Sequence, residues 1–366
     1  MCRIFSYIIC IFCFTLALCL GCSAIEVSAK SAYALEADSC DTIFEKNADT
    51  RMSMASTTKI MTAIVAIENA SLDTIVKITP EMVGVEGSSI YLQEGEKLTI
   101  EELLYALLLE SANDASLAIA CSVAGSVEGF VEMMNDKAQE LGLENTHFTN
   151  PHGLDENEHY TTAKELALLA SYAMDNPIFY DIVSTYKRVI PLGEDGSRVL
   201  INHNKLLHQY DGAIGVKTGF TKKSGRCLVS CAEIDGVRII AVTLNAPSDW
   251  DDHTKMLDLG FTMYEGIKLA DIGDYNISLD VINGKKSSIL CSNLNGLNIT
   301  LKRDNINISA YLEANRMVSA PIKQGDYVGR IVFKNNGEEI ASLNLYALEN
   351  VKEIKYKKSI FERIFG

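Results

Sequence analysis

Three short motifs, far apart in the chain, constrain its fold more than any other feature, because their side chains form one chemical unit only if they meet. They are S-T-T-K at residues 56–59, S-A-N at 111–113 and K-T-G at 217–219. The first supplies a serine nucleophile and an amine base one helical turn later, and the others add a second hydroxyl, an amide and a cationic strand. Each motif alone is common, but the three in this order favour a serine enzyme that attacks a carbonyl without a histidine.

The segments around the motifs predict an α+β layer structure, in which helices gather between an N-terminal strand pair and a later run of antiparallel strands. Capping boxes at Thr99–Glu102 and Thr162–Glu165 predict two helix starts, and Gly142 predicts a helix end. The expected strands are residues 32–37, 43–47, 214–217, 227–231 and 237–242. The expected helices are residues 56–67, 101–109, 127–141, 162 to before 176, and 251–263.

After about residue 268 the composition shifts toward Asn, Ile, Ser and Gly, and helical periodicity gives way to short alternating runs. The runs 330–333 and 340–343, joined through residues 335–337, predict a β-hairpin. We therefore expect a small second all-β domain that carries no constellation suggesting chemistry. The predicted division is a signal peptide at 1–29, a catalytic domain at 30–267, a β domain at 268–351 and a tail at 352–366.

The N-terminal segment is predicted to be an export signal. Residues 4–20 are almost continuously apolar, Arg3 is the only charge before Glu26, and small residues follow the apolar run. Cleavage is expected near Ala24 or Ala29. The alternative is an uncleaved N-terminal anchor, because such a run is at the low end of the length that spans a bilayer.

Charge and cysteine usage exclude several classes of protein. A net charge of −15 argues against nucleic-acid binding, which needs concentrated Lys and Arg. The five cysteines beyond the signal region are scattered and odd in number, so they are not a disulfide framework. Cys227 and Cys231 lie too far apart along one strand to bridge, and we expect them to be small buried hydrophobes. Histidines and cysteines never fall at ligand spacing, so no metal and no cofactor is expected.

Ser56 needs a base within hydrogen-bond reach, because a serine hydroxyl is a poor nucleophile at physiological pH. Lys59 lies on the same helix face, and the helix end adds backbone N–H groups for an oxyanion. Lys59 must be neutral part of the time, so we expect burial or the positive charge of Lys217 to lower its pKa. The alternative is an ordinary helix start with a solvated lysine.

The second motif supplies a hydroxyl and an amide. Ser111 is expected to relay a proton toward the leaving group, and Asn113 is expected to hold both Lys59 and the substrate amide. The alternative is a polar turn after an apolar helix, with Asn113 as a cap.

The third motif lies on an expected edge strand. Lys217 and Thr218 can bind a free carboxylate, and Gly219 lets a substrate backbone approach closely. The alternative is a strand that simply runs into a turn. The enzyme interpretation fails only if the alternatives for all three motifs hold at once.

The chain resembles the D-alanyl-D-alanine carboxypeptidase family of low-molecular-weight penicillin-binding proteins over nearly everything after the signal. The resemblance rests on A-S-T-T-K-I-M-T-A at 55–63, S-A-N-D-A at 111–115, F-T-N-P-H-G-L-D at 148–155 and D-G-A-I-G-V-K-T-G-F-T at 211–221. It implies a β-lactamase/transpeptidase-like catalytic domain, an antiparallel sheet with helices, followed by a small all-β domain.

The same resemblance implies removal of the terminal D-alanine from peptidoglycan stem peptides through an acyl-enzyme on Ser56, with β-lactams as covalent inhibitors. Such an enzyme works outside the cytoplasm, on the cell-wall side of the cytoplasmic membrane. The backbone N–H groups of Ser56 and Phe220 would form the oxyanion hole. Arg226 departs from the family pattern, because an aromatic residue is expected after Gly225.

Two other functions are alternatives to this one. A class A β-lactamase needs a further glutamate to activate the deacylating water, and E-x-x-N at 132–135 has the required form. However, this motif lies in the middle of a helix too soon after Ser111, and residues 148–155 carry no such glutamate. A non-catalytic peptidoglycan-binding protein is the other alternative, and the intact trio of motifs argues against it.

The last fifteen residues are predicted to contact a membrane. Four lysines between 352 and 358 precede I-F-E-R-I-F at 360–365, whose apolar pairs recur at helical spacing. A short amphipathic helix of this kind can lie in the headgroup region of an anionic membrane, and the family resemblance points the same way. The alternative is a frayed tail or a helix packed on the β domain.

Overall fold

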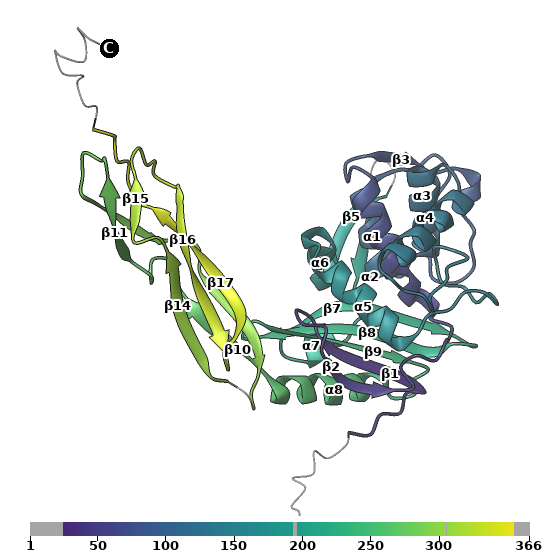
Figure 1. The fold of residues 1–366 in the computed structure, drawn as a ribbon. Helices are drawn as coiled ribbons and strands as arrows, with labels where there is room; N and C mark the ends of the chain where they lie inside the picture. Colours follow the sequence, from purple (N-terminus) through teal and green to yellow (C-terminus); the bar gives the residue numbers. More distant parts are fainter. Residues whose placement is uncertain (1–24, 193–195, 305, 355–366) are drawn as a thin grey trace, which may run out of the picture.

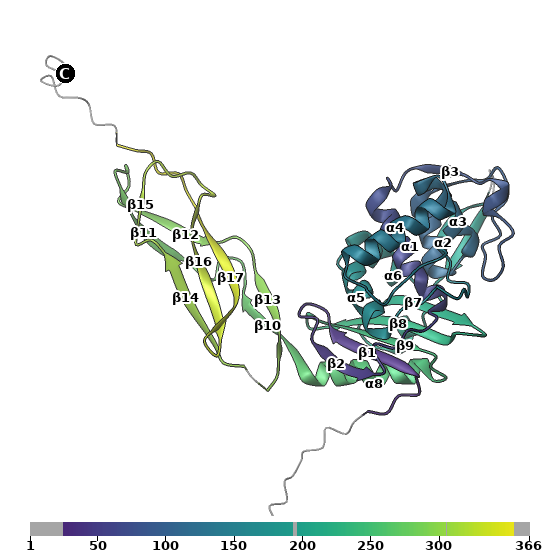
Figure 2. The same ribbon diagram turned by 45° about the vertical axis from the view of Figure 1, so that its right-hand side comes forward.

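The computed structural model describes residues 25–192, 196–304 and 306–354, which form two parts (Figures 1 and 2). The first part stacks helices on a sheet and ends with helix α8 (Asp249–Met263). The second part contains only strands and extends away from the first, so the molecule is elongated. The predicted α+β layers followed by a small all-β region are confirmed.

The central sheet of the first part joins strands from both ends of this region of the chain. Its strands are β1 (Ser31–Glu36), β2 (Thr42–Lys46), β7 (Ala213–Thr221), β8 (Gly225–Ile234) and β9 (Val237–Leu244). They pair antiparallel in the order β2-β1-β9-β8-β7, which leaves β7 at one edge. Along β1, Tyr33 and Leu35 face the main core, whereas Ala32 and Ala34 pack with residues of α8, as the two-residue period of a strand requires.

Helices cover the face of the sheet opposite α8 (Figure 1). They are η1 (Ala55–Thr58), α1 (Lys59–Asn69), η2 (Pro80–Met82), α2 (Ile100–Leu109), α3 (Asn113–Ala124), α4 (Val127–Glu140), α5 (Ala163–Met174) and α6 (Pro177–Ser184). The short helix α7 (Leu206–Gln209) instead precedes Tyr210, which packs with α8. Two short strand pairs are β3 (Ile75–Lys77) with β4 (Lys97–Thr99), and β5 (Lys187–Leu192) with β6 (Gly196–Ile201). Strand β5 was not predicted, because all of its residues except Ile190 are exposed and it lacks apolar alternation.

The predicted helix starts rest on local hydrogen bonds. The Thr99 hydroxyl accepts from the Glu102 N–H, and the Glu102 carboxylate accepts from the Thr99 N–H, so this capping box is complete. The Thr162 hydroxyl caps α5 in the same way. The carboxylate of Glu165, however, does not close the second box; it accepts from the N–H of Asn145 instead. Only half of that predicted capping box therefore forms.

The second part contains two sheets, and its cores are separate from those of the first part. The predicted hairpin forms between β16 and β17, with Asn336 and Gly337 in the left-handed region that a tight turn requires. Strand β10 crosses the boundary predicted between residues 267 and 268. The strands are β10 (Tyr264–Ala270), β11 (Ile277–Ile282), β12 (Ser288–Asn293), β13 (Leu297–Lys302), β14 (Ile308–Ala314), β15 (Met317–Ser319), β16 (Tyr327–Asn335) and β17 (Glu338–Ala347).

Direct contacts join the two parts where β10 leaves α8. The Tyr264 hydroxyl donates to the Asp41 carboxylate at 3.0 Å, and Lys302 pairs with the same carboxylate at 2.7 Å. Gly266 has no room for a side chain, because a Cβ there would lie 1.9 Å from the carbonyl oxygen of Asp235. The second part is therefore seated against the first rather than merely tethered to it.

The first described residues are anchored under the sheet. Ser28 and Ala29 donate three hydrogen bonds to the carboxylate of Asp252, and Ala29 is fully buried. Of the two predicted cleavage positions, Ala24 leaves these contacts intact, whereas cleavage after Ala29 removes them. Residues 1–24, which hold most of the predicted signal, lie outside the described residues.

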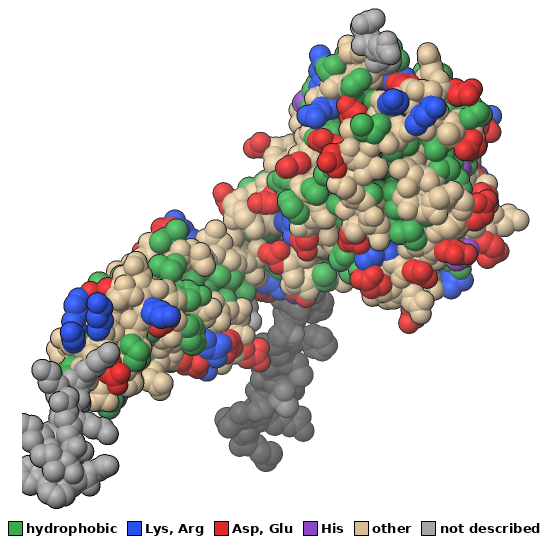
Figure 3. Space-filling view, turned by 90° about the horizontal axis from the view of Figure 1, so that it is seen from above, with side chains coloured by type: hydrophobic (Ala, Val, Ile, Leu, Met, Phe, Trp, Pro, Cys, Tyr) green, Lys and Arg blue, Asp and Glu red, His purple; other side chains and the backbone are tan. Residues whose placement is uncertain are grey.

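At the other end, residues 352–354 belong to the second part. The N–H of Ile354 donates to Asn283, and Lys352 accepts from the N–H of Lys285. Residues 355–366 lie outside the described residues. Within the described residues, no single helix is long and apolar enough to cross a membrane; α3 and α4, bent by 85° at their junction, pass that test only as a pair. Figure 3 shows Lys and Arg side chains grouped at the end of the second part from which the tail leaves.

Candidate active site

The nucleophile lies on a tight turn that precedes the first long helix. Ser56 is in η1, a 3-10 turn, and the α-helix expected from residue 56 begins only at Lys59. Ala55 has a positive φ of 48°, which is unusual for a residue with a side chain. Hydroxyls of the following threonines hold the turn, since Thr57 donates to Met54 O at 2.6 Å and Thr58 donates to Ala55 O at 2.8 Å.

Lys59 has no exposed surface, and its ammonium group is surrounded by oxygen acceptors. Its Nζ lies 3.0 Å from Ser56 Oγ and 2.7 Å from Asn113 Oδ1, and it also donates to the carbonyl oxygen of His152. Burial, and next the charge of Lys217, lower the pKa of Lys59 well below its ordinary value, while Asp114 opposes this shift. Both predicted causes of a lowered pKa are therefore present.

The S-A-N motif lies between α2 and α3. Ser111 adopts a positive φ of 60° and is almost fully buried. The side-chain amide of Asn113 bridges two segments: its oxygen accepts from Lys59, and its nitrogen donates to Glu86 O at 2.6 Å. The side-chain nitrogen of Asn113 thus uses one of its two hydrogens on the backbone of the segment that contains Glu86.

The K-T-G motif lies on the edge strand β7, directly against the nucleophile turn. A Cβ on Gly219 would lie 3.1 Å from the backbone nitrogen of Ser56, so glycine permits this close approach. Phe220 exposes two thirds of its surface. Lys217 is buried, its Nζ donates to Thr218 O at 3.0 Å, and burial lowers its pKa to about 7.

The three motifs converge on one pocket. Its lining includes Ser56, Ser111, Thr218, Gly219 and Phe220. The remaining predicted residues, Lys59, Asn113 and Lys217, lie buried behind it and reach the lining residues through hydrogen bonds or their charge. The pocket is completed by Ser88, His203, Lys205, Arg226, Asp249 and Trp250.

A buried histidine that sequence reasoning missed supports the nucleophile turn. His159 Nδ1 accepts from the Thr149 N–H at 3.0 Å, so Nε2 carries the proton and donates to Thr58 Oγ1 at 2.7 Å. Burial, and next the neighbouring His152, lower the pKa of His159 to about 4, so the ring is neutral at physiological pH. Nothing in the local sequence marks this residue, because its partners are 10 and 101 residues away.

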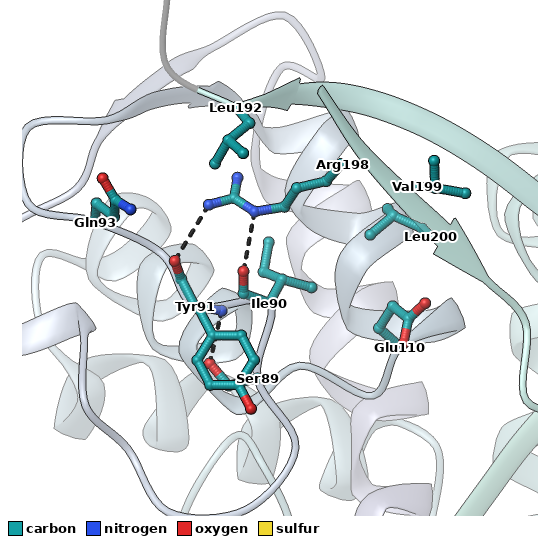
Figure 4. A pocket seen from close by; sticks show the side chains of 9 residues that line it. All are labelled: Ser89, Ile90, Tyr91, Gln93, Glu110, Leu192, Arg198, Val199 and Leu200. Atoms are coloured by element: carbon teal, nitrogen blue, oxygen red, sulfur yellow. Dashed lines mark hydrogen bonds between the residues drawn. The ribbon is translucent and has the colours of Figure 1, made fainter. Parts of the chain in front are cut away.

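A second hollow lies beside the catalytic pocket, between β5–β6 and the segment 89–93 (Figure 4). Arg198 spans it and donates to Ile90 O at 2.9 Å and Tyr91 O at 3.2 Å. Glu110 lines this hollow, and its carboxylate pairs at 3.1 Å with His203, which lines the catalytic pocket. The two hollows are therefore neighbours that share this pair. Within the described residues, no three potential metal ligands gather.

Comparison with known proteins decides which family this site belongs to. Residues 20–248 match the family model described as D-alanyl-D-alanine carboxypeptidase. The chain belongs to the D-alanyl-D-alanine carboxypeptidase family. It is a serine-type carboxypeptidase and a penicillin-binding protein, as the resemblance predicted, and its peptidoglycan substrate lies outside the cytoplasm. Residues 264–353 match a second model, described as the C-terminal domain of penicillin-binding protein 5.

Similar proteins extend over both parts of the carboxypeptidase. The chain is 34% identical to the D-alanyl-D-alanine carboxypeptidase DacF of Bacillus subtilis, over 90% of this chain and 88% of the relative. Penicillin binding protein 5 from Haemophilus influenzae is 28% identical with a TM-score of 0.66, over 91% of this chain and 100% of the other. A structure titled a peptidoglycan synthesis regulatory factor (PBP3) from Streptococcus pneumoniae is 26% identical with a TM-score of 0.72, over 90% and 100%.

The rival β-lactamase interpretation is not favoured. Glu132 is exposed on α4, while Phe130 and Met134 of the same helix are buried, so the E-x-x-N pattern is a helix face. Asn135 donates to the carbonyl oxygen of Phe148 rather than to the pocket. Among the described residues, no glutamate lines the catalytic pocket of this carboxypeptidase.

Proposed function

We propose that Ser56 is the nucleophile that cleaves the terminal D-Ala-D-Ala bond of peptidoglycan stem peptides, with Lys59 as its base. The observation that carries this proposal is the 3.0 Å contact between Lys59 Nζ and Ser56 Oγ, made by a lysine with no exposed surface and a lowered pKa. A buried amine that is neutral part of the time can accept the serine proton.

The other contacts of Lys59 orient its lone pair. A neutral amine has two N–H groups, and Asn113 Oδ1 and His152 O are two acceptors that can hold them. The lone pair then faces Ser56 Oγ, which is the direction needed to remove its proton. The arrangement therefore prepares the base before substrate binds.

Acylation follows from this arrangement. Ser56 Oγ gives its proton to Lys59 and attacks the carbonyl carbon of the penultimate D-alanine. The backbone N–H groups of Ser56 and Phe220 stabilise the oxyanion. The C–N bond then breaks, the leaving amine takes a proton that Ser111 relays from Lys59, and the terminal D-alanine departs. Water attacks the acyl-enzyme in the second half of the reaction and releases the shortened peptide.

The substrate backbone would lie along the edge strand β7. Thr218 and Gly219 line the pocket there, and Asn113 can offer its second amide hydrogen to a substrate carbonyl. Lys217, buried behind Thr218, acts through its charge on Lys59.

The same proposal includes peripheral membrane contact through residues 355–366, after export by the N-terminal signal. Lysines at the end of the second part support it, since Lys285 and Lys352 line one hollow beside the point where the tail leaves. Attraction of these lysines to an anionic membrane surface would add to burial of the apolar tail residues.

The test of the nucleophile is intact-mass spectrometry after incubation with benzylpenicillin. Wild type should gain one penicilloyl group, and Ser56→Ala should gain none and should release no D-alanine from a pentapeptide ending in D-Ala-D-Ala. A penicilloyl adduct on Ser56→Ala would contradict the assignment. Rapid repeated hydrolysis of benzylpenicillin with no peptide turnover would favour a β-lactamase instead.

A further inference from the structure

We propose that Arg226 binds the free carboxylate of the terminal D-alanine and thereby selects peptides with an unblocked C-terminus. The inference rests on the proposed function of the pocket. It concerns Arg226, at the position after Gly225 where the resemblance led us to expect an aromatic residue.

The fold places Arg226 next to the K-T-G motif. It lies on β8 directly opposite Phe220 of β7, and residues opposite each other in a pair of strands are about 5 Å apart. Its backbone oxygen accepts from the Ala246 N–H at 2.9 Å, which fixes the start of the strand. Its side chain is 44% exposed and lines the same pocket as Ser56 and Thr218.

A buried acid anchors the guanidinium. Arg226 Nε donates at 2.8 Å to Oδ1 of Asp249, whose side chain is only 5% exposed, and the same oxygen accepts from the Trp250 N–H at 3.1 Å. The centre of the guanidinium lies 5.9 Å from the centre of the Trp250 ring. This contact uses only Nε. Neither terminal nitrogen of Arg226 makes a hydrogen bond with the described residues, so a forked donor remains for a carboxylate.

Lys217, the cation predicted for this role, is less suited to it. Its ammonium group is buried, donates to Thr218 O, and has a pKa of about 7, so it carries only part of a charge at neutral pH. An arginine stays protonated in any protein environment. Lys205, the other lysine or arginine that lines the pocket, is exposed and has no carboxylate anchor among the described residues.

The carboxylate of the substrate would therefore lie between the Thr218 hydroxyl and the Arg226 fork. Placing the negative charge there puts the scissile carbonyl of the preceding residue toward Ser56, because all three side chains face one pocket. Arg226 would be a specificity residue, and Asp249 a positioning residue that acts through it.

The experiment compares cleavage of the last peptide bond in two pentapeptides. One has a free C-terminal carboxylate and releases D-alanine, and the other has a C-terminal amide and releases D-alaninamide. Losing a charge-assisted hydrogen bond costs about 10- to 100-fold in binding, so Arg226→Gln should lower kcat/KM for the free peptide by that factor. For the amide peptide, which has no terminal carboxylate, the same substitution should change kcat/KM little. For the free peptide, kcat/KM of Arg226→Lys should lie between the values for wild type and Arg226→Gln, because lysine keeps the charge but has no forked pair of donors.

Two further variants sharpen the test. Asp249→Asn should lower kcat/KM for the free peptide and leave kcat/KM for the amide peptide unchanged, because it removes the carboxylate that holds Arg226 in place. Lys268→Gln removes an exposed lysine that does not line the pocket and is the matched control, with an expected change below about twofold. Equal loss on both peptides in Arg226→Gln, or no loss on either, would overturn the inference. A wild-type enzyme that releases neither D-alanine from the free peptide nor D-alaninamide from the amide would contradict the proposed function itself, and this inference with it.

Discussion

Lys59 and Lys217 are two lysines with almost no exposed surface, and each lies next to a residue that lines the catalytic pocket. Desolvation makes the charged form of each lysine costly, and the positive charge of Lys217 lowers the pKa of Lys59 further. At the scale of single residues, therefore, the reactivity of Ser56 depends on the burial of Lys59 and Lys217, because that burial lowers the pKa of the base that takes the serine proton.

Removing the Lys217 charge should shift the pH dependence of acylation. The positive charge of Lys217 lowers the pKa of Lys59, so Lys217→Gln should raise it. Because Lys59 must lose its proton to act as base, the acidic limb of the pH profile for benzylpenicillin acylation should move to higher pH. On that limb the rate falls about tenfold for each unit by which the pKa rises. Lys268→Gln, which removes an exposed lysine that does not line the pocket, is the control and should leave the limb in place. An unmoved limb in Lys217→Gln would contradict the argument.

At the scale of elements, the layer between the sheet and α8 contains a buried polar group. His253 of α8 contacts the hydroxyls of Ser230 on β8 and Thr243 on β9, and it has no exposed surface. Burial lowers its pKa to about 3. The helix is thus fixed to two strands by a ring that must stay neutral.

The stability of this layer should depend on pH. The folded-state pKa of His253, about 3, lies below the ordinary value of 6.5, so the unfolded chain binds the extra proton. Stability should therefore rise with pH between about 3 and 6.5 and be lost as the pH falls through that window. His152 and His159, whose pKa values are lowered to about 4, add to the same trend.

Urea unfolding at pH 4.5 and pH 7, followed by the fluorescence of Trp250, the single tryptophan, measures this effect at α8. His253→Gln should reduce the dependence of the unfolding free energy on pH by up to about 1.4 kcal/mol per unit. Thr243→Val removes a partner of the ring but no titrating group, so it should lower stability at both pH values equally. Identical pH slopes for wild type and His253→Gln would show the argument to be wrong.

At the scale of the whole molecule, the all-β part carries the chain away from the catalytic part (Figures 1 and 2). Residues 352–354 pair with this part, so the tail leaves from its far end, where Lys and Arg side chains gather. A membrane contact at that end would hold the catalytic pocket at a distance from the bilayer.

Deleting residues 355–366 should abolish co-sedimentation with anionic vesicles and leave hydrolysis of a soluble pentapeptide unchanged. The deletion removes the apolar residues of the tail but keeps the paired residues 352–354, so the β fold should persist. Binding of the full chain should weaken in high salt, because lysine attraction to anionic lipid is screened. Replacing the apolar residues at 360, 361, 364 and 365 by serine is the matched variant and should also fail to sediment. Equal sedimentation of the full and shortened chains would exclude the tail as the anchor.

Local signals in the sequence determined much of this protein. The Thr99–Glu102 capping box and the hairpin turn at Asn336 and Gly337 formed as predicted, because their hydrogen bonds and dihedral preferences involve neighbouring residues. The three motifs likewise specified the family and the groups in the pocket. Local signals were insufficient at two places. The capping box predicted at Thr162 is incomplete because Glu165 bonds to Asn145, and strand β5 was not predicted because it is mostly exposed.

Only the tertiary structure decided which residues hold the side chains of the catalytic pocket in position. The His152 carbonyl behind Lys59, the contact of His159 with Thr58, and the Asp249 anchor of Arg226 join residues 93, 101 and 23 positions apart. No local pattern predicts these three contacts, because the partners meet only when the sheet closes between the two ends of the catalytic part. The burial that lowers the pKa of Lys59 arises in the same way, since water is excluded by packing from segments that are distant in sequence.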